Sequence, residues 1–180
     1  VGVAGRRDAA LPVAYSLVMQ AASLHSPAEL VVTSFASAAS APSWDFLKWL
    51  PHVASAQSPI GAQHLAATGP ACTALADQLD EVIASRSSKD AAPWSTTVLV
   101  IIEGDAPIDR SRLVDIAERG VGRGVAVLWI AEGQPRLPAV CTSYVIVEEG
   151  ATVGYVRQSE SVTPVRLQAC TEAQAAGAAR

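Results

Sequence analysis

Short apolar runs alternate along the chain with stretches whose apolar residues recur at helical spacing. Three of the runs, at 29–35, 96–102 and 124–131, are rich in β-branched residues and predict buried strands. Because the run TTVLVII at 96–102 is continuously apolar, we expect it in the middle of a sheet with both faces covered. Residues 143–156 predict two more strands, joined by a tight turn at 148–151.

Helices are expected between these runs. The first begins with Asp8 as its N-cap and ends near 25–29, and the second covers 70–86. The third covers 108–120, with Asp109 as N-cap and Gly120 at the C-terminal cap. Residues 53–70 have no clear period and are expected to be loop. This alternation predicts a three-layer α/β sandwich with a mostly parallel sheet and an antiparallel pair at its edge.

Composition narrows the class of protein. Half of the 180 residues are apolar and 17% are charged, which predicts one globular domain. A formal net charge of −4 offers no basic surface for a nucleic acid. Cys72, Cys141 and Cys170 are too far apart to predict a disulfide framework or a metal pair, so a reducing, cytosolic setting is the simplest inference. No apolar run approaches the roughly 20 residues that cross a bilayer, so we expect no membrane insertion.

The two ends of the sequence suggest a fragment. It starts without Met, where a first strand is already ending, and stops in an Ala-rich stretch at 168–180. We therefore expect one domain over 1–165 and the start of a linker helix to a following domain over 166–180.

The opening VGVAGRRDA, with glycines at Gly2 and Gly5, has the strand, turn and helix start that bind phosphate in nucleotide-binding α/β proteins. A working loop has the pattern G-x-x-x-x-G-K-[ST]. Laid on the sequence from Gly2, this pattern places Arg7 at the second glycine. Asp8 then replaces the lysine and Ala9 the hydroxyl residue that binds magnesium. We expect this vestigial loop to hold no phosphate, because a carboxylate at Asp8 repels it by on the order of several kcal/mol at an effective dielectric of about 20.

Glu103 and Asp105 follow the strand predicted at 96–102, where α/β proteins carry magnesium or general-base carboxylates. The run resembles a Walker B strand, except that Gly104 stands at the second, catalytic acid. We expect both acids to be solvated at the start of a loop. The alternative is that Arg6 and Arg7 bind phosphate while Glu103 binds the metal, which makes the chain a nucleotide sensor or a weak ATPase that uses ATP and magnesium.

Other chemistry finds no support in the sequence. His25, His52 and His64 lack the spacing of metal ligands, and no G-x-S-x-G nucleophile elbow is present. We expect each histidine to be exposed or locally hydrogen-bonded, and we expect no catalytic residue and no metal site.

The segments LVMQAASLHSPAELVVTSF at 17–35 and WDFLKWLPHV at 44–53 resemble FtsK/SpoIIIE-type motor ATPases. They are most similar to the membrane-anchored EccC component of actinobacterial type VII secretion systems. The resemblance continues through VLVIIEGD, GRGVAVLWIA and RLPAVCTSYVIVEEG, and so covers nearly the whole chain. It implies a RecA-like, P-loop NTPase-like α/β domain, one of several in tandem on one polypeptide.

In that family the domain nearest the membrane lacks a working P-loop. The departures at Arg7, Asp8, Ala9 and Gly104 place this chain with such degenerate domains. The resemblance therefore implies a non-catalytic domain on the cytoplasmic side of the membrane, without a cofactor, which couples the membrane part of the motor to downstream ATPase domains in protein export. Its partners would be those domains and other secretion-complex subunits in an oligomer. A stand-alone protein-binding module is a further alternative.

The aromatic segment 44–53 allows two interpretations. Trp44, Leu47 and Leu50 share one helical stripe and Pro51 ends the helix, which favours packing in the core. The second interpretation is an interface with a neighbouring domain, because tryptophans are good interface anchors. Its candidate residues are Trp44, Trp49, Leu50 and His52. Asp45 and Lys48 are expected to form an exposed pair worth about a few tenths of a kcal/mol.

Overall fold

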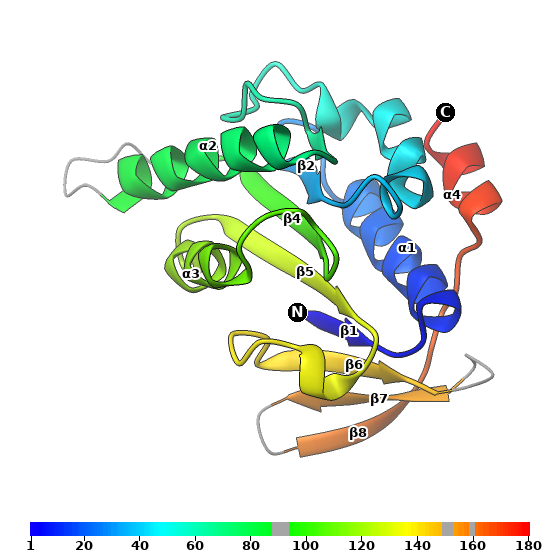
Figure 1. Cartoon of the computed structure of the whole chain (residues 1–180). Coiled ribbons are helices and arrows are strands. Elements are labelled where there is room, and N and C mark those ends of the chain that lie inside the picture. The colour runs from blue at the N-terminus through cyan, green and yellow to red at the C-terminus, as the bar shows by residue number, and fades with distance from the viewer. Residues whose placement is uncertain (88–93, 149–152, 159–160) are drawn as a thin grey trace.

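The structure is a computed structural model that describes residues 1–87, 94–148, 153–158 and 161–180. Its described strands form one sheet in the order β3-β2-β4-β5-β1-β6-β7-β8 (Figure 1). The parallel part consists of β1 (Gly2–Ala4), β2 (Leu30–Phe35), β3 (Leu65–Ala66), β4 (Thr97–Glu103), β5 (Val125–Ala131) and β6 (Ser143–Val147). Two strands extend it with antiparallel pairing, β7 (Val153–Gln158) and β8 (Ser161–Arg166).

Helices cover both faces of this sheet (Figure 1). On one face lie α1 (Arg7–Leu24), α4 (Glu172–Ala178) and the 3₁₀ helix η1 (Ala41–Trp49). On the other face lie α2 (Gly69–Ser87) and α3 (Arg110–Gly120). Two short 3₁₀ turns, η2 (Pro51–Val53) and η3 (Gln134–Arg136), complete the described elements. The predicted α/β sandwich with a mostly parallel sheet is therefore confirmed.

The strand predicted at 96–102 does lie in the middle of the sheet. β4 pairs with β2 on one side and with β5 on the other. Val100 and Ile102 belong to the core on the α2–α3 face, whereas Ile101 belongs to the core on the α1 face. All three side chains are fully buried, which explains why the run is apolar from Val98 to Ile102.

Two strands were missed. β3 lies within the stretch expected to be loop, and two residues are too few to show a period. β8 turns the expected antiparallel pair into a three-stranded extension, and its mostly exposed residues include a proline, which suits an edge strand. The predicted turn at 148–151 lies mostly outside the described residues.

The helix caps were predicted with mixed success. Asp109 caps α3 by accepting a 2.8 Å hydrogen bond from the Ser111 N–H, as expected. Asp8 was wrong as N-cap, because α1 begins at Arg7, so that Arg6 is its N-cap and Asp8 lies in its first turn. Gly120 is the last residue of α3 and not its cap; the left-handed backbone comes later, at Gly122 with φ of 72° and Gly124 with φ of 66°.

The segment expected to begin a linker at 166–180 packs back onto the domain. A capping box between Thr171 and Gln174 starts α4, which contacts α1 and η1. Ala175 and Ala179 are buried in the same core as α1. A domain that follows this segment stays a prediction.

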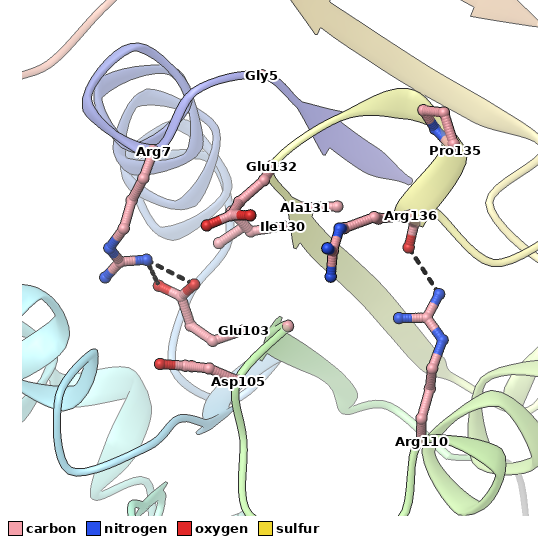
Figure 2. A pocket seen from close by; sticks show the side chains of 11 residues that line it. Gly5, Arg7, Glu103, Asp105, Arg110, Ile130, Ala131, Glu132, Pro135 and Arg136 are labelled. Carbon is pink, nitrogen blue, oxygen red and sulfur yellow. Dashed lines mark hydrogen bonds and ion pairs between the residues drawn. The ribbon is translucent and has the colours of Figure 1, made fainter.

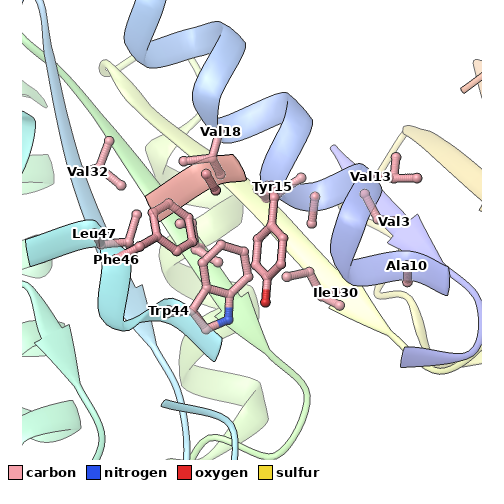
Figure 3. Close-up of a cluster of buried hydrophobic side chains, with 14 of the residues drawn as sticks. Val3, Ala10, Val13, Tyr15, Val18, Val32, Trp44, Phe46, Leu47 and Ile130 are labelled. Atoms are coloured by element: carbon pink, nitrogen blue, oxygen red, sulfur yellow. The ribbon is translucent and has the colours of Figure 1, made fainter. Parts of the chain in front are cut away.

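The aromatic segment lies mainly in the core between η1, α1 and the sheet (Figure 3). The Tyr15 ring meets the rings of Trp44 and Phe46 edge-on, with centroids 5.1 and 5.4 Å apart. A 3₁₀ helix repeats every three residues, so it places Trp44 and Leu47 on one stripe.

Burial corrects the interface prediction for three of its four residues. Trp44, Leu50 and His52 are buried inside this domain and offer no surface to a neighbour. Trp49 is the exception, with 51% of its surface exposed. The expected pair of Asp45 and Lys48 is present on the exposed side.

Candidate functional site

A cavity of about 490 Å³ opens where the carboxyl ends of β1, β4 and β5 meet the start of α3 and η3 (Figure 2). Open α/β sheets bind their ligands at this edge. The lining residues are Gly5, Arg7, Glu103, Gly104, Asp105, Arg110, Ile130, Ala131, Glu132, Pro135 and Arg136.

An ion pair between Arg7 and Glu103 occupies one side of the cavity (Figure 2). The Arg7 Nη1 donates to both carboxylate oxygens of Glu103 at 2.7 Å. The indole Nε1 of Trp44 donates to Glu103 Oε1, also at 2.7 Å, and Arg7 Nη2 donates to Ser43 Oγ at 3.2 Å. Glu103 is only 4% exposed, so these donors replace water around its charge.

Strand register brings these distant residues together. Ile130 on β5 pairs with Val3 on β1 and with Glu103 on β4. Because α1 starts three residues after the end of β1, its first residue, Arg7, can reach across β5 to Glu103. The expectation that both acids are solvated is therefore wrong for Glu103.

The turn between β1 and α1 is shorter than the P-loop pattern assumed. Gly2 lies inside β1, which leaves only Gly5 and Arg6 between strand and helix. The Gly5 N–H is already bonded to the carbonyl of Ala131 at 3.1 Å. Phosphate-binding loops need several consecutive free N–H groups, so the pattern laid from Gly2 does not fit this backbone.

Close packing accounts for both glycines. A Cβ at Gly5 would lie 2.6 Å from the carbonyl oxygen of Val147, and one at Gly2 would lie 2.8 Å from a methyl group of Leu137. The clash at Gly5 is with backbone and leaves no room for a side chain, whereas the clash at Gly2 would require the Leu137 side chain to shift. The glycines therefore let β1 and the turn approach their neighbours, whether or not a ligand is present.

Asp8 does not occupy the position expected of it. Its carboxylate is 69% exposed, pairs with Arg6 at 3.0 Å and does not line the cavity. The hydrogen bond from Arg6 lowers the pKa of Asp8, and the N–H of Ala9 adds to this effect. Ala9 itself packs against the core. Asp8 is therefore not positioned to repel a phosphate in the cavity. The charged residues at that place are Arg7 and Glu103.

Asp105 is exposed, as expected, but its carboxylate is held. Ser37 Oγ donates to one oxygen at 2.6 Å and Ser40 Oγ to the other at 2.8 Å. These bonds tie the end of β4 to the loop before η1.

Sequence reasoning missed Arg110, Glu132 and Arg136. Arg110 directly follows the predicted helix cap, and Glu132 and Arg136 follow the end of a predicted strand. Their position after these ends is the signal in the sequence that could have identified them. Arg110 Nη2 donates to the carbonyl of Arg136 at 2.6 Å, and its guanidinium lies 5.1 Å from the ring centre of Trp129.

The rings of His52 and His64 are held by backbone carbonyls. His52 and His64 are hydrogen-bonded to the carbonyls of His25 and Val32, while His25 is exposed. Among the described residues, no three His, Cys, Asp or Glu side chains gather as a metal ion requires. Within the same part of the chain, no helix combines the length and the apolar character needed to span a bilayer.

No protein-family model and no curated protein matches the sequence. Solved structures do match. ATPases 2 and 3 of EssC from Geobacillus thermodenitrificans align with a TM-score of 0.58 and 13% identity, over 96% of this chain and 39% of that one. The cytoplasmic domain of the type VII secretion ATPase EccC from Thermomonospora curvata aligns with a TM-score of 0.62 and 11% identity, over 94% of this chain and 23% of that one.

The cytoplasmic domain of EssC also aligns, with a TM-score of 0.55 and 10% identity, over 94% of this chain and 39% of that one. This chain therefore spans between 23% and 39% of the length of these neighbours. Its fold is that of the EssC and EccC ATPase domains, as the resemblance in its sequence implied.

Proposed function

We propose that this chain is a non-catalytic, ATPase-like domain of a type VII secretion motor, which couples the membrane part of the motor to ATPase domains further along the same polypeptide. Its partners are those domains and other subunits of an oligomeric secretion complex on the cytoplasmic side of the membrane. The likeness to EssC and EccC supports the motor context. The Arg7–Glu103 ion pair carries the proposal that the domain does not hydrolyse ATP.

An ATPase of this type needs a lysine for the phosphates and a carboxylate that is free to organise magnesium. In this chain both oxygens of Glu103 accept hydrogen bonds from Arg7, and one also accepts from Trp44. A magnesium ion at Glu103 would meet the positive charge of Arg7 at ion-pair distance. Arg7 and Glu103 therefore neutralise each other, whereas in an ATPase the corresponding charges bind the phosphates and the magnesium ion.

The alternative of a nucleotide sensor or weak ATPase requires Arg6 and Arg7 to turn toward a phosphate. Arg6 lies on the surface beside Asp8, and Arg7 would have to abandon a nearly buried carboxylate. Leaving such a carboxylate without its partner costs about 3 kcal/mol or more. The geometry therefore favours the non-catalytic function.

Isothermal titration calorimetry of the 180-residue chain with ATP and magnesium tests the proposal. We expect no micromolar binding and no phosphate release, either in the native chain or in Glu103→Gln. The matched control is Glu118→Gln, which neutralises an exposed glutamate on α3. Micromolar binding with turnover in the native chain, abolished by Glu103→Gln but not by Glu118→Gln, would establish the ATPase alternative and refute the proposal.

A further inference from the structure

Two arginines lie on the side of the cavity opposite the Arg7–Glu103 pair. Arg110 and Arg136 both line the cavity, and in the described part of the chain neither forms an ion pair. Figure 2 shows the Arg136 side chain pointing toward the middle of the cavity, while the Arg110 side chain reaches the backbone of Arg136. The mechanism proposed above uses neither residue.

Arg110 is held in place before any ligand arrives. Its Nη2 donates to the backbone carbonyl of Arg136 at 2.6 Å, and its guanidinium covers Trp129 at 5.1 Å from the ring centre. The same hydrogen bond ties the start of α3 to η3, so the Arg110 guanidinium stays beside the backbone of Arg136. A guanidinium that is already oriented loses less conformational entropy when it binds an anion.

The net charge of the lining residues limits the charge of the anion that the cavity can bind. Three arginines face three acids, Glu103, Asp105 and Glu132, so the cavity has no surplus positive charge for a triphosphate. Asp105 is bonded to two serine hydroxyls and Glu103 to Arg7, both away from Arg110 and Arg136. Among the described residues, the third acid, Glu132, forms no ion pair with either arginine. The guanidinium groups of Arg110 and Arg136 therefore remain for one planar, singly charged carboxylate, which matches their fork of donors.

We infer that Arg110 and Arg136 bind the carboxylate of an acidic side chain from a neighbouring protein domain, at the edge of the sheet where an ATPase would hold its nucleotide. This inference rests on the proposed function. Both arginines are exposed at the mouth of the cavity, within reach of another domain. The similar structures are chains of which this fold forms less than half, so a domain of this fold has others beside it in those proteins.

The test uses the peptide acetyl-Ala-Ala-Glu-Ala-Ala-amide and its counterpart with Gln in place of Glu. Their binding is followed by NMR through the side-chain Nε–Hε resonances of Arg110 and Arg136. We expect the Glu peptide to shift both resonances and to bind at least tenfold more tightly than the Gln peptide. Arg136→Gln and Arg110→Gln should each weaken the Glu peptide at least tenfold. The matched control, Arg123→Gln at the opposite end of β5, should not change its affinity.

Parallel titrations with inorganic phosphate and with ATP–magnesium separate the outcomes. Phosphate that binds the two arginines more tightly than the Glu peptide would overturn the inference and leave the proposed function intact. Equal responses to the Glu and Gln peptides, or none to either, would also overturn only the inference. Micromolar ATP binding that depends on Arg110 and Arg136, accompanied by turnover, would overturn both.

Discussion

The pair of Arg7 and Glu103 at the edge of the sheet and the ion pairs between α2 and α3 use the same types of side chain in different surroundings. At the edge, the carboxylate of Glu103 is 4% exposed and accepts an indole N–H as well as the guanidinium. Between the helices, Arg112 bonds to Asp77 and Asp80, and Arg119 bonds to Asp80 and Asp115. The arginines of the two regions are similarly exposed, since Arg7 is 37% exposed, but the carboxylates of this second group are at least 32% exposed.

The number of ion pairs in a region is therefore a poor guide to how much they contribute to the free energy of unfolding. An exposed pair contributes about 0–1 kcal/mol, because water solvates both partners when the pair opens. Removing one partner of a buried pair costs about 3–5 kcal/mol, because the other charge is left without water. We expect the single pair at the sheet edge to outweigh the whole network between α2 and α3.

The largest difference in stability is expected when one arginine is replaced in each region. Arg7→Met should lower the free energy of unfolding by about 3 kcal/mol, because it leaves the nearly buried Glu103 carboxylate with Trp44 as its remaining donor. Arg112→Met, the matched change in the exposed network, should cost less than about 1 kcal/mol. Urea denaturation of both variants measures the difference. Similar losses in the two variants would contradict the assigned role of burial.

A smaller effect is expected from Tyr15, which packs against Trp44 beside the buried pair. Burial raises the pKa of Tyr15 to about 12, although the Ser43 side chain opposes this shift. The unfolded chain releases the tyrosine proton near pH 10 while the folded chain keeps it, so stability is complete below pH 10 and falls as the pH rises toward 12. The decline reaches at most about 1.4 kcal/mol per pH unit.

Denaturation curves between pH 9 and pH 12 test this expectation. Tyr15→Phe should flatten the alkaline decline because phenylalanine has no proton to lose. An unchanged decline in this variant would assign the alkaline sensitivity to other groups.

The smallest effect is expected in the exposed network. Burial of Asp80 opposes a lowered pKa, but hydrogen bonds from Arg119 and Arg112 prevail and lower it. The stability that Asp80 contributes is therefore present above about pH 4 and is lost as the pH falls through its lowered pKa. Asp80→Asn should remove this acid-dependent part, at a cost below about 1 kcal/mol at neutral pH. Acid denaturation at low salt measures it, and a loss above about 2 kcal/mol would place the network with the buried pair.

The fold was predictable where periodicity was long and continuous. The strands at β2, β4 and β5 and the helices α2 and α3 follow directly from apolar spacing, and Asp109 was recognisable as a cap. β3 is two residues long and β8 is mostly exposed, so neither has a hydrophobic pattern to detect.

The candidate site was predictable only in part. Glu103 was expected at a strand end because carboxyl ends of parallel strands meet at one edge. Its partner was not predicted, since Arg7 is 96 positions away and the two residues meet only through the strand order. Trp44 was assigned to the core or to an interface, and only the structure shows that its N–H serves the carboxylate. The predicted role of Asp8 at the phosphate site was wrong, because the sequence pattern does not reveal that the turn between β1 and α1 contains only two residues.

The strand order also determines when the molecule can assemble. β1 lies between β5 and β6, so Val3 pairs with both Ile130 and Val145. The middle of the sheet cannot close until both partner strands have left the ribosome, and contacts so distant in sequence form slowly. Until then α1 has no completed sheet to cover its apolar residues. A nascent chain with this topology therefore exposes these apolar residues for a long interval, and such exposed surface is prone to aggregation.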